Sequence, residues 1–363
     1  MTGSTIALID HCARPLMQND SGVCRPLAYR QAKQLIRQED SVARFRLPNL
    51  LPYATEMAGS LARNLDARLF PGYHLRQRLQ GRTVLVTGAS TGIGEALAHR
   101  LARAGAHVLL SARSTEKLEN VVSLIEQHGG RATAYPCDIA NPEDCERMAA
   151  EVLAEHPRID ILVNNAGRSI RRPVMHSLNR FHDFERTMQL NYFGAIRLTM
   201  ALLPRMVEQG GAQVINVSTL GMQTIPARFS AYLASKGALE MWTQAAANEL
   251  GHRRIRFTLV NFPLVRTPMI APTEIYRYTP AISPEQAVDQ ICRAIITRQK
   301  RVASPFAYFA QTAHAVLPTL SEAMVNLAYQ VTPESAAARG KVLPPPQDYR
   351  DNVRPLRRRR RRF

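Results

Sequence analysis

From residue 81 onwards, short apolar runs alternate with segments of helix length. The runs are rich in β-branched residues or leucine, and several have the length of a buried strand. They are TVLVT at 83–87, HVLLS at 107–111, ATAYPC at 132–137, DILVN at 160–164, QVINV at 213–217 and RFTLV at 256–260. Continuous apolar strands joined by crossover helices are typical of a parallel sheet covered on both faces. The pattern therefore predicts a doubly wound α/β domain of the Rossmann type.

Changes in this pattern give the domain boundaries. Prolines break residues 1–80 into short pieces, some with helical periodicity, which we interpret as a partly helical N-terminal extension. The regular part predicts one domain over 81–304, which ends after a helix begun by Ser-Pro-Glu at 283–285 and a last short strand. An apolar helical segment is expected at 305–345, and a disordered basic tail at 346–363.

The composition narrows the class of protein. With 363 residues, 45% of them apolar, the chain is neither collagen-like, coiled-coil nor wholly disordered. The cysteines are odd in number and form no CxxC pair, so neither a disulfide framework nor a metal site is indicated. A signal peptide and an apolar run of about 18 residues are both lacking. We expect a cytoplasmic protein.

The net charge of +18 is concentrated at the C-terminus. Seven positive charges come from Arg354 and residues 357–362. The favoured interpretation of such a run is a solvated end. The alternative is an arm that contacts an anionic membrane, a nucleic acid or an acidic partner. We do not expect nucleic acid to be a partner.

A glycine-rich turn follows the first predicted strand and leads into a helix. The turn runs from Thr87 to Gly94, and its glycines permit a tight turn, close approach of the backbone to a pyrophosphate, and close packing of helix on strand. The helix N-terminus offers unpaired N–H groups to the phosphates. The dinucleotide would contact Gly88, Ser90, Thr91, Gly92, Ile93 and Gly94.

Arg113 ends the second predicted strand, where an NAD enzyme would place a carboxylate for the ribose 2′-hydroxyl. An arginine there can pair with a 2′-phosphate, which favours NADP(H) over NAD(H). The alternative is a solvated arginine at a strand end. Asp138, followed by Ile139, comes after the third strand, where its carboxylate could accept from the adenine amino group.

Tyr232 and Lys236 carry the strongest chemical signal. Their spacing of four residues places both on one face of a helix. An ammonium close to a phenol favours the phenolate, which would lower the tyrosine pKa from about 10 toward a value useful for proton transfer. The alternative is a surface pair on an amphipathic helix.

These residues, with Asn164-Asn165-Ala166-Gly167, Asn191 and the pair Ser218-Thr219, resemble the short-chain dehydrogenase/reductases over about 81–304. The resemblance implies that Tyr232 is the general acid/base, that Lys236 binds the nicotinamide ribose and that Asn191 holds a relay water. It also implies a homo-oligomer and cofactor contacts from Asn165, Ala166, Gly167, Pro263, Val265 and Thr267.

Two positions depart from that family's pattern. The family's serine lies thirteen residues before the tyrosine, which here is Thr219, so we assign the oxyanion contact to Thr219 and hold Ser218 in reserve. The family's Pro-Gly after the sixth strand reads Pro263-Leu264, which alters the loop that contacts the nicotinamide.

A narrower resemblance suggests a substrate. AGRSIRRP at 166–173, FHDFERTMQLNYFGA at 181–195, RFSAYLASK at 228–236 and PLVRTPMIAPTEIY at 263–276 are similar to bacterial fatty acyl-CoA reductases. Those enzymes convert a long-chain acyl-CoA to the fatty aldehyde with NADPH. The alternatives are a carbonyl reductase or alcohol dehydrogenase for a lipophilic substrate, and a binding protein that holds the dinucleotide as a structural ligand.

Three arginines follow the fourth strand at the carboxyl edge of the predicted sheet. Arg168, Arg171 and Arg172 could hold CoA phosphates there, or they could be solvated loop charges. Apolar groups from 264–276 and 302–325 would take the acyl chain.

Residues 302–321 contain no Asp, Glu, Lys or Arg, yet two prolines, a glutamine and a histidine argue against a membrane-spanning helix. Apolar helix faces are most often buried in the protein core, which is the favoured interpretation. The alternative is a lid or an interfacial element that contacts a membrane surface.

Overall fold

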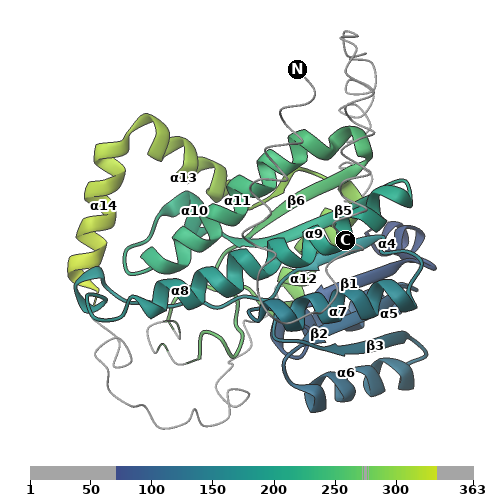
Figure 1. Ribbon diagram of the computed structural model, residues 1–363. Coiled ribbons are helices and arrows are strands. Elements are labelled where there is room, and N and C mark those ends of the chain that lie inside the picture. Colours follow the sequence, from purple (N-terminus) through teal and green to yellow (C-terminus); the bar gives the residue numbers. More distant parts are fainter. Residues whose placement is uncertain (1–70, 272, 274–275, 277, 333–363) are drawn as a thin grey trace, which may run out of the picture. The chain divides into compact units, whose positions relative to one another are not determined.

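One parallel sheet organises the part of the chain that the computed structural model describes, residues 71–271, 273, 276 and 278–332 (Figure 1). Its strand order is β3-β2-β1-β4-β5-β6-β7. The strands are β1 (Thr83–Thr87), β2 (His107–Ala112), β3 (Arg131–Pro136), β4 (Ile161–Asn164), β5 (Ala212–Thr219), β6 (Ile255–Phe262) and β7 (Arg301–Val302). Each strand predicted from an apolar run is present, with ends that agree to within two residues. The doubly wound α/β prediction is confirmed.

Helices cover both faces of the sheet. One face carries α4 (Pro71–Leu79), α5 (Gly92–Arg103), α6 (Thr115–Gln127) and α12 (Pro284–Thr297), and the other carries α7 (Pro142–Glu155), α9 (Ala195–Glu208) and α11 (Ser230–Leu250). Successive side chains of β1 enter different cores, since Val84 and Val86 pack under the first group and Leu85 under the second. Burial on both faces explains why the strands are apolar throughout.

Shorter elements complete the described chain. They are η2 (Val174–His176), α8 (His182–Met188), the π-helical turn η3 (Gln189–Gly194), α10 (Gly221–Thr224), η4 (Gly251–Arg253), α13 (Pro305–Val316) and α14 (Pro318–Val331). All of them except η4, which directly precedes β6, lie in connections after the carboxyl ends of β4, β5 or β6, or in the chain after β7. They therefore surround the edge of the sheet where ligands bind in open α/β folds.

The α4 helix lies in the segment that the sequence assigns to the N-terminal extension, yet it belongs to the α/β core. Leu75 and Leu79 are buried there, and the helix packs against α12. Two buried leucines contribute roughly 3 kcal/mol or more. The α/β unit thus begins at least one helix before residue 81, and residues 1–70 lie outside the described part.

The apolar segment after β7 forms two helices that are largely exposed. Ala307 is the one side chain of α13 and α14 that is buried, whereas Phe309 is 70% exposed and Met324 65%. The expectation that this segment is buried in the core is therefore wrong for its described part, because α13 packs only one side against α10 and α14 continues away from the sheet (Figure 1). Residues 333–345 and the basic tail lie outside the described residues.

None of the described helices combines the length and the apolar character that crossing a bilayer requires.

Candidate active site

A cleft of about 780 Å³ opens at the carboxyl edge of the sheet. It lies where the strand order reverses, because the chain builds the sheet from β1 outwards to β3 and then returns to place β4 on the other side of β1. Ligands of open α/β sheets bind at this switch point. The volume lies within the range of about 300–1,000 Å³ that small-molecule sites occupy.

The glycine turn forms one wall of the cleft. Gly88 and Gly92 have φ angles of +67° and +62°, a left-handed conformation that favours glycine. Gly94 is needed for a different reason, since a Cβ there would lie 2.1 Å from the carbonyl oxygen of Gly88. The first turn of α5 reaches this wall, and Ser90, Thr91 and Ile93 also line the cleft. The arrangement offers backbone N–H groups and a helix N-terminus to an anion.

Thr87 connects this wall to the loop that follows β4. Its Oγ1 accepts hydrogen bonds from the backbone N–H groups of Asn165 and Ala166, both at 3.0 Å. The Asn165 side chain returns a bond from Nδ2 to the Thr87 carbonyl oxygen at 3.0 Å. Asn165, Ala166 and Gly167 all line the cleft, as expected from the sequence.

Arg113, Asp138 and Ile139 lie together in the cleft beyond the ends of β2 and β3. The Asp138 carboxylate accepts from the backbone N–H of Ala140 at 3.1 Å, which fixes its orientation. Lys117 lines the same region, and the sequence analysis missed it. Its signal was its place in the first turn of the helix that follows Arg113.

Tyr232 and Lys236 project from one face of α11 into the cleft, and Thr219 at the end of β5 lies beside Tyr232. Burial raises the pKa of Tyr232 to about 12, and the adjacent Thr219 hydroxyl opposes this rise. Burial lowers the pKa of Lys236 to about 8, whereas the charge of Glu240 opposes this fall. All three side chains line the same cleft.

The direction of the Tyr232 shift differs from the sequence expectation. The pKa is raised, with burial as the largest cause, and the Lys236 ammonium donates to the Val217 carbonyl oxygen at 2.8 Å. Spacing of four residues places two side chains on one helix face but does not determine where each polar end points. The lowering of the Tyr232 pKa that the sequence led us to expect is therefore not found in the protein alone.

The two candidate hydroxyls at the end of β5 have different partners. Thr219 lies beside Tyr232, whereas the Ser218 hydroxyl donates to Glu240 Oε1 at 2.5 Å, although Ser218 also borders the cleft. Adjacent strand residues point to opposite sides, which explains the division. The geometry favours Thr219 for the oxyanion contact.

A buried polar network supports this segment from behind, and the sequence analysis missed it. Glu240 Oε1 also accepts from Asn261 Nδ2 at 2.6 Å, and Glu240 Oε2 accepts from Arg301 at 2.8 Å. Asn261 Nδ2 donates in addition to the Thr219 carbonyl oxygen at 3.0 Å. The network joins α11, β5, β6 and β7. The sequence did contain a signal for this network, because Glu240 lies one helical turn after Lys236.

Asn191 anchors the loop after β4 from the π-helical turn. Its Oδ1 accepts from the Arg168 N–H at 2.7 Å, and its Nδ2 donates to the Arg168 carbonyl oxygen at 2.8 Å and to Ser235 Oγ at 2.9 Å. The buried side chain thus positions the loop next to Lys236, where a Cβ on Gly167 would come within 3.5 Å of Nζ. The relay water assigned to Asn191 stays a prediction.

Comparison with known proteins agrees with this geometry. The sequence profile described as short chain dehydrogenase matches residues 82–275. The chain belongs to this family. A fatty acyl-CoA reductase of Acinetobacter baylyi is 47% identical over 266 residues, which cover 73% of this chain and 90% of that protein. A fatty acyl-CoA reductase of Mycobacterium tuberculosis is 39% identical over 249 residues, covering 68% and 85%.

A solved structure of a metagenomic short-chain oxidoreductase in complex with NADP is also similar. It has a TM-score of 0.54 and 33% identity, and the match covers 62% of this chain and 98% of that chain. These findings confirm the predicted family and make the protein an oxidoreductase of the short-chain dehydrogenase family.

In this short-chain dehydrogenase, the three candidate substrate arginines are not equivalent. Arg168 and Arg171 line the cleft, while Arg172 is not among its lining residues. Arg172 Nε instead donates to Asp183 Oδ2 at 3.1 Å. Burial lowers the pKa of Arg168, and the charges of Arg186 and Arg113 add to this effect. The expectation that all three face the substrate is therefore wrong for Arg172, because a buried acid on α8 holds its guanidinium.

Asp183 on α8 is the centre of an arginine cluster, which we define as Arg172, Arg180 and Arg186 and call the arginine cluster around Asp183. The Asp183 carboxylate pairs with Arg180 at 3.1 Å and with Arg186 at 2.5 Å, in addition to Arg172. Burial alone would raise the pKa of Asp183, but the hydrogen bond from Arg180 and the neighbouring arginine charges outweigh it and lower the pKa.

Apolar side chains form the part of the cleft beyond Tyr232. Leu264, Met269, Ile270 and Tyr276 come from the predicted stretch 264–276, and Pro263, Val265 and Thr267 also line the cleft. Phe229, Leu233 and Pro226 add to this wall and were missed. The described residues of 302–325 do not line it, so the expectation that they take the acyl chain directly is wrong. Those that follow β7 approach the site through the packing of α13 on α10.

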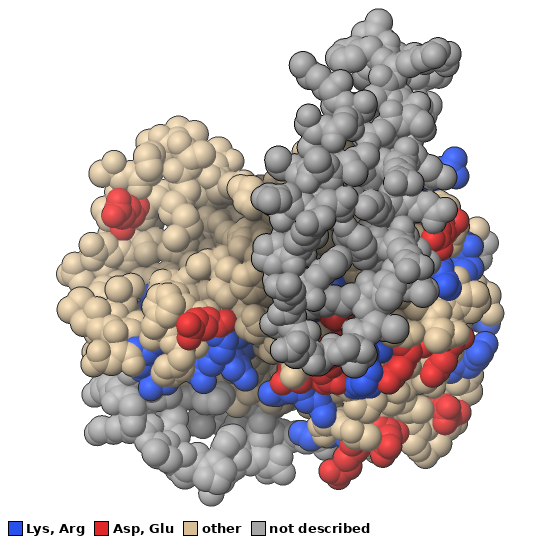
Figure 2. All heavy atoms as spheres, viewed as in Figure 1, with Lys and Arg blue, Asp and Glu red and all other residues tan. Residues whose placement is uncertain are grey.

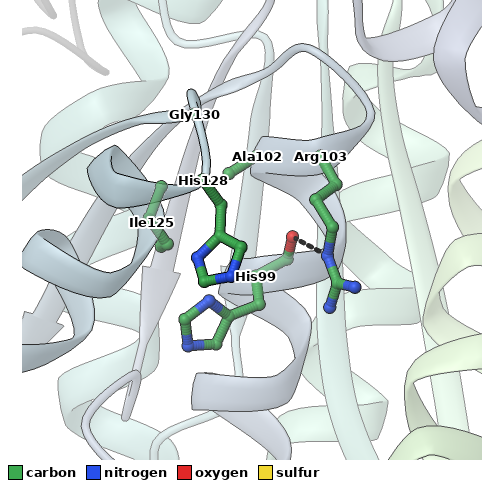
Figure 3. A pocket seen from close by; sticks show the side chains of 6 residues that line it. All are labelled: His99, Ala102, Arg103, Ile125, His128 and Gly130. Atoms are coloured by element: carbon green, nitrogen blue, oxygen red, sulfur yellow. Dashed lines mark hydrogen bonds between the residues drawn. The ribbon is translucent and has the colours of Figure 1, made fainter.

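A second, small hollow of about 110 Å³ lies between α5 and α6 (Figure 3). None of the residues that line it also lines the cleft. His99, Arg103 and His128 surround it, and Arg103 Nε donates to the His99 carbonyl oxygen at 3.2 Å. Across the described residues, no group of three or more His, Cys, Asp or Glu side chains is arranged to hold a metal ion.

Proposed function

We propose that this short-chain dehydrogenase uses NADPH to reduce a long-chain fatty acyl-CoA to the fatty aldehyde. One observation carries the proposal: Thr219, Tyr232 and Lys236 line one cleft together with the glycine turn and with apolar side chains such as Met269 and Ile270. The two relatives named fatty acyl-CoA reductase support the choice of substrate. The net reaction consumes one acyl-CoA, one NADPH and one proton, and yields aldehyde, NADP⁺ and free CoA.

The cofactor half of the cleft fits a dinucleotide. The space that a Cβ on Gly94 would fill is occupied by the Gly88 backbone, so the turn is closed tightly around the start of α5. Arg113 and Lys117 supply two cations beyond β2, which suits a 2′-phosphate and supports NADPH as the reductant. When bound, NADPH supplies the hydride.

The residues of this chain then handle the oxygen and the proton. The Tyr232 and Thr219 hydroxyls would donate to the thioester oxygen as negative charge develops on it. Tyr232 would transfer its proton to that oxygen, and its high pKa keeps the phenol protonated near neutrality. Lys236, held at Val217, would contact the nicotinamide ribose. Collapse of the hemithioacetal breaks the C–S bond and releases CoA as the thiol.

The substrate half provides both kinds of contact that an acyl-CoA needs. Arg171 and Arg168 offer guanidinium groups for the CoA phosphates. Phe229, Met269 and Ile270 offer apolar surface for the acyl chain, and each buried methylene contributes about 0.8 kcal/mol.

A thiol-release assay tests the proposal. The protein is incubated with palmitoyl-CoA, NADPH and a thiol-reactive dye, and we expect one thiol for each NADPH oxidised. NADPH oxidation by a lipophilic ketone or aldehyde, without thiol release from any acyl-CoA, would instead establish the alternative, a carbonyl reductase or alcohol dehydrogenase with the same catalytic residues. NADPH binding without oxidation by any of these substrates would support the binding-protein alternative.

We also propose a cytoplasmic location and a homo-oligomer. The free thiols of Cys137, Cys145 and Cys292 suit a reducing compartment. Exposed Met200 on α9 and Met241 on α11 lie on helices that flank the sheet, where a second copy could pack.

A further inference from the structure

Exposed apolar side chains are concentrated on one edge of the described molecule. All the exposed large apolar residues except Phe193, Met200 and Met241 fall in 174–181, in 225, in 269–278 or in 306–331. These segments follow the carboxyl ends of β4, β5, β6 and β7. Because the strands are parallel, these ends share one edge of the sheet, which is also the edge where the cleft opens. The distribution therefore marks the surroundings of the cleft.

The α13–α14 hairpin supplies most of this apolar area. Leu320, Met324, Leu327 and Val331 follow at spacings of three and four residues, and so form one stripe along α14. Glu322 is the one Asp, Glu, Lys or Arg residue between 305 and 331. Figure 2 shows a broad, nearly uncharged area over α13 and α14. A patch of this kind usually marks a protein or membrane contact.

Arg228 fixes the end of the hairpin beside the cleft. Its guanidinium donates to the carbonyl oxygens of Tyr329 at 3.1 Å and Thr332 at 2.6 Å, and it lies 4.4 Å from the Tyr329 ring centroid. The Arg228 carbonyl oxygen accepts from the Arg172 N–H at 2.7 Å. At its other end the hairpin packs through α13 on α10, and Thr224 of α10 lines the cleft. The hairpin is thus attached at one end to α10 and at the other to Arg228, which directly precedes the cleft residue Phe229.

Positive charge borders the apolar area. The arginine cluster around Asp183 includes Arg172, whose backbone N–H donates to the Arg228 carbonyl oxygen. Its three cations pair with the Asp183 carboxylate on α8, a helix that also carries Glu185. Arg180 and Arg186 keep 39% and 44% of their side-chain surface exposed. In Figure 2 a group of Lys and Arg side chains borders the uncharged area where α8 lies. Exposed Leu178 and Phe181 lie within two residues of Arg180 in the chain.

We propose that this edge, formed by the α13–α14 hairpin and the arginine cluster around Asp183, docks on the surface of an anionic lipid bilayer. Apolar side chains that enter the acyl region, bordered by arginines at the level of the headgroups, are the combination that interfacial elements use. Such docking would present the mouth of the cleft to the lipid phase. This last point, and not the docking itself, rests on the proposed function.

Vesicle binding by the purified full-length protein tests the proposal. Co-sedimentation is measured with phosphatidylcholine vesicles and with phosphatidylcholine–phosphatidylglycerol vesicles. The variant Met324→Ser/Leu327→Ser removes two exposed apolar groups from the α14 stripe. The matched control Asn326→Ser/Gln330→Ser places two serines in the same helix at exposed positions without removing apolar side chains. Circular dichroism and the melting temperature verify that both fold.

We expect the first variant to bind anionic vesicles about tenfold more weakly than the parent. Transfer of two side chains of this size from water into the bilayer is favourable enough to change the affinity by at least that factor. The control should bind like the parent, and neutral vesicles should bind the parent more weakly than anionic ones. Hydrogen exchange on vesicles should be slowed over 305–331. Equal vesicle binding by parent and apolar variant overturns the proposal, since attachment would then come from elsewhere, such as the Arg-rich tail.

A second copy of the chain is the competing occupant. If Met324→Ser/Leu327→Ser changes the sedimentation coefficient in solution and leaves vesicle binding unchanged, the surface is a contact between copies and the proposal is wrong. The assay uses neither NADPH nor acyl-CoA. A failure of the proposed reaction, detected as no thiol release, is therefore distinguishable from a failure of membrane docking.

Discussion

The carboxylate of Glu240 accepts a hydrogen bond from the guanidinium of Arg301 at 2.8 Å, although the two residues lie on α11 and on the last strand of the sheet. The side chains are only 7% and 20% exposed. Glu240 is also one helical turn from Lys236 and raises the pKa of that lysine against the effect of burial. Glu240 therefore affects both the stability of the fold, through Arg301, and the protonation of Lys236 in the cleft.

Glu240→Gln should lower the free energy of unfolding by about 3 kcal/mol, because it leaves the Arg301 cation without its buried carboxylate. Urea unfolding measures the loss. The double variant Glu240→Gln/Arg301→Gln removes the cation as well and should recover part of that stability. A single variant as stable as the parent would show that the ion pair contributes nothing to the fold.

The same substitution should change the pH dependence of turnover. The pKa of Lys236 is about 8, so the ammonium is lost as the pH rises through that value, and activity that depends on it should fall there. Glu240→Gln removes the negative charge that raises this pKa, so the alkaline limb should move to lower pH. The double variant keeps the shifted limb although its stability is partly restored. An unchanged limb in both variants would exclude Lys236 as the titrating group.

Tyr232→Phe should reduce turnover at least about a hundredfold, because it removes the proposed general acid while keeping the ring. NADPH binding, followed by the fluorescence of the bound nucleotide, should persist, since the glycine turn and Arg113 are untouched. Turnover close to that of the parent would contradict the assigned role.

The neighbouring hydroxyls of β5 allow a comparison within one strand. Thr219→Ala should lower kcat about a hundredfold through loss of an oxyanion donor, and Thr219→Ser should restore most of it. Ser218→Ala should leave kcat within a few fold but destabilise the fold by about 1–3 kcal/mol, because Glu240 loses a buried donor. Steady-state kinetics and urea unfolding separate the two effects. The reverse assignment, with Ser218 catalytic, predicts the opposite pattern.

The sequence was sufficient where a feature depends on neighbours along the chain. TVLVT could be identified as a strand because its side chains are apolar on both faces, and Thr219 could be chosen over Ser218 by its spacing from Tyr232. Both rest on local periodicity or on a family pattern. The fold contains the predicted strand and places Thr219 beside Tyr232, while the catalytic role of Thr219 stays a prediction.

Features that depend on distant partners could not be found in this way. Glu240 meets Arg301 from 61 residues away, and Arg172 is held by Asp183 on another element. The apolar sequence of α13 and α14 led us to expect burial, yet composition does not say which surface covers a helix. Charge partners and solvent exposure are set by the packed fold rather than by the local pattern.

Arg113→Ala should reduce kcat/KM for NADPH by roughly tenfold to a hundredfold, the range of one charge-assisted hydrogen bond, and leave kcat/KM for NADH nearly unchanged. Lys117→Ala should act in the same direction with a smaller effect, since an ammonium makes one contact rather than a bidentate pair. Initial rates with each nucleotide decide this. Equal losses with NADPH and NADH would mean that neither residue recognises the 2′-phosphate.

Arg171 and Arg172 are adjacent in the chain but should respond differently to substitution. Arg171→Ala should raise KM for palmitoyl-CoA about tenfold, because a guanidinium that lines the cleft no longer meets the CoA phosphates, while KM for a free lipophilic aldehyde changes little. Arg172→Ala should instead lower the free energy of unfolding by about 2 kcal/mol, because Asp183 loses one partner of a buried carboxylate, with similar effects on both substrates.

The control for this comparison is Arg172→Lys, which keeps the charge beside Asp183 and should restore most of the stability without affecting KM. Equal losses by Arg171→Ala on acyl-CoA and on aldehyde would indicate that Arg171 shapes the cleft as a whole. A selective loss on acyl-CoA would place the nucleotide part of the substrate at the loop after β4, in the cleft that Met269 and Ile270 also line. The thioester carbon would then lie between that loop and these apolar side chains, within reach of Tyr232.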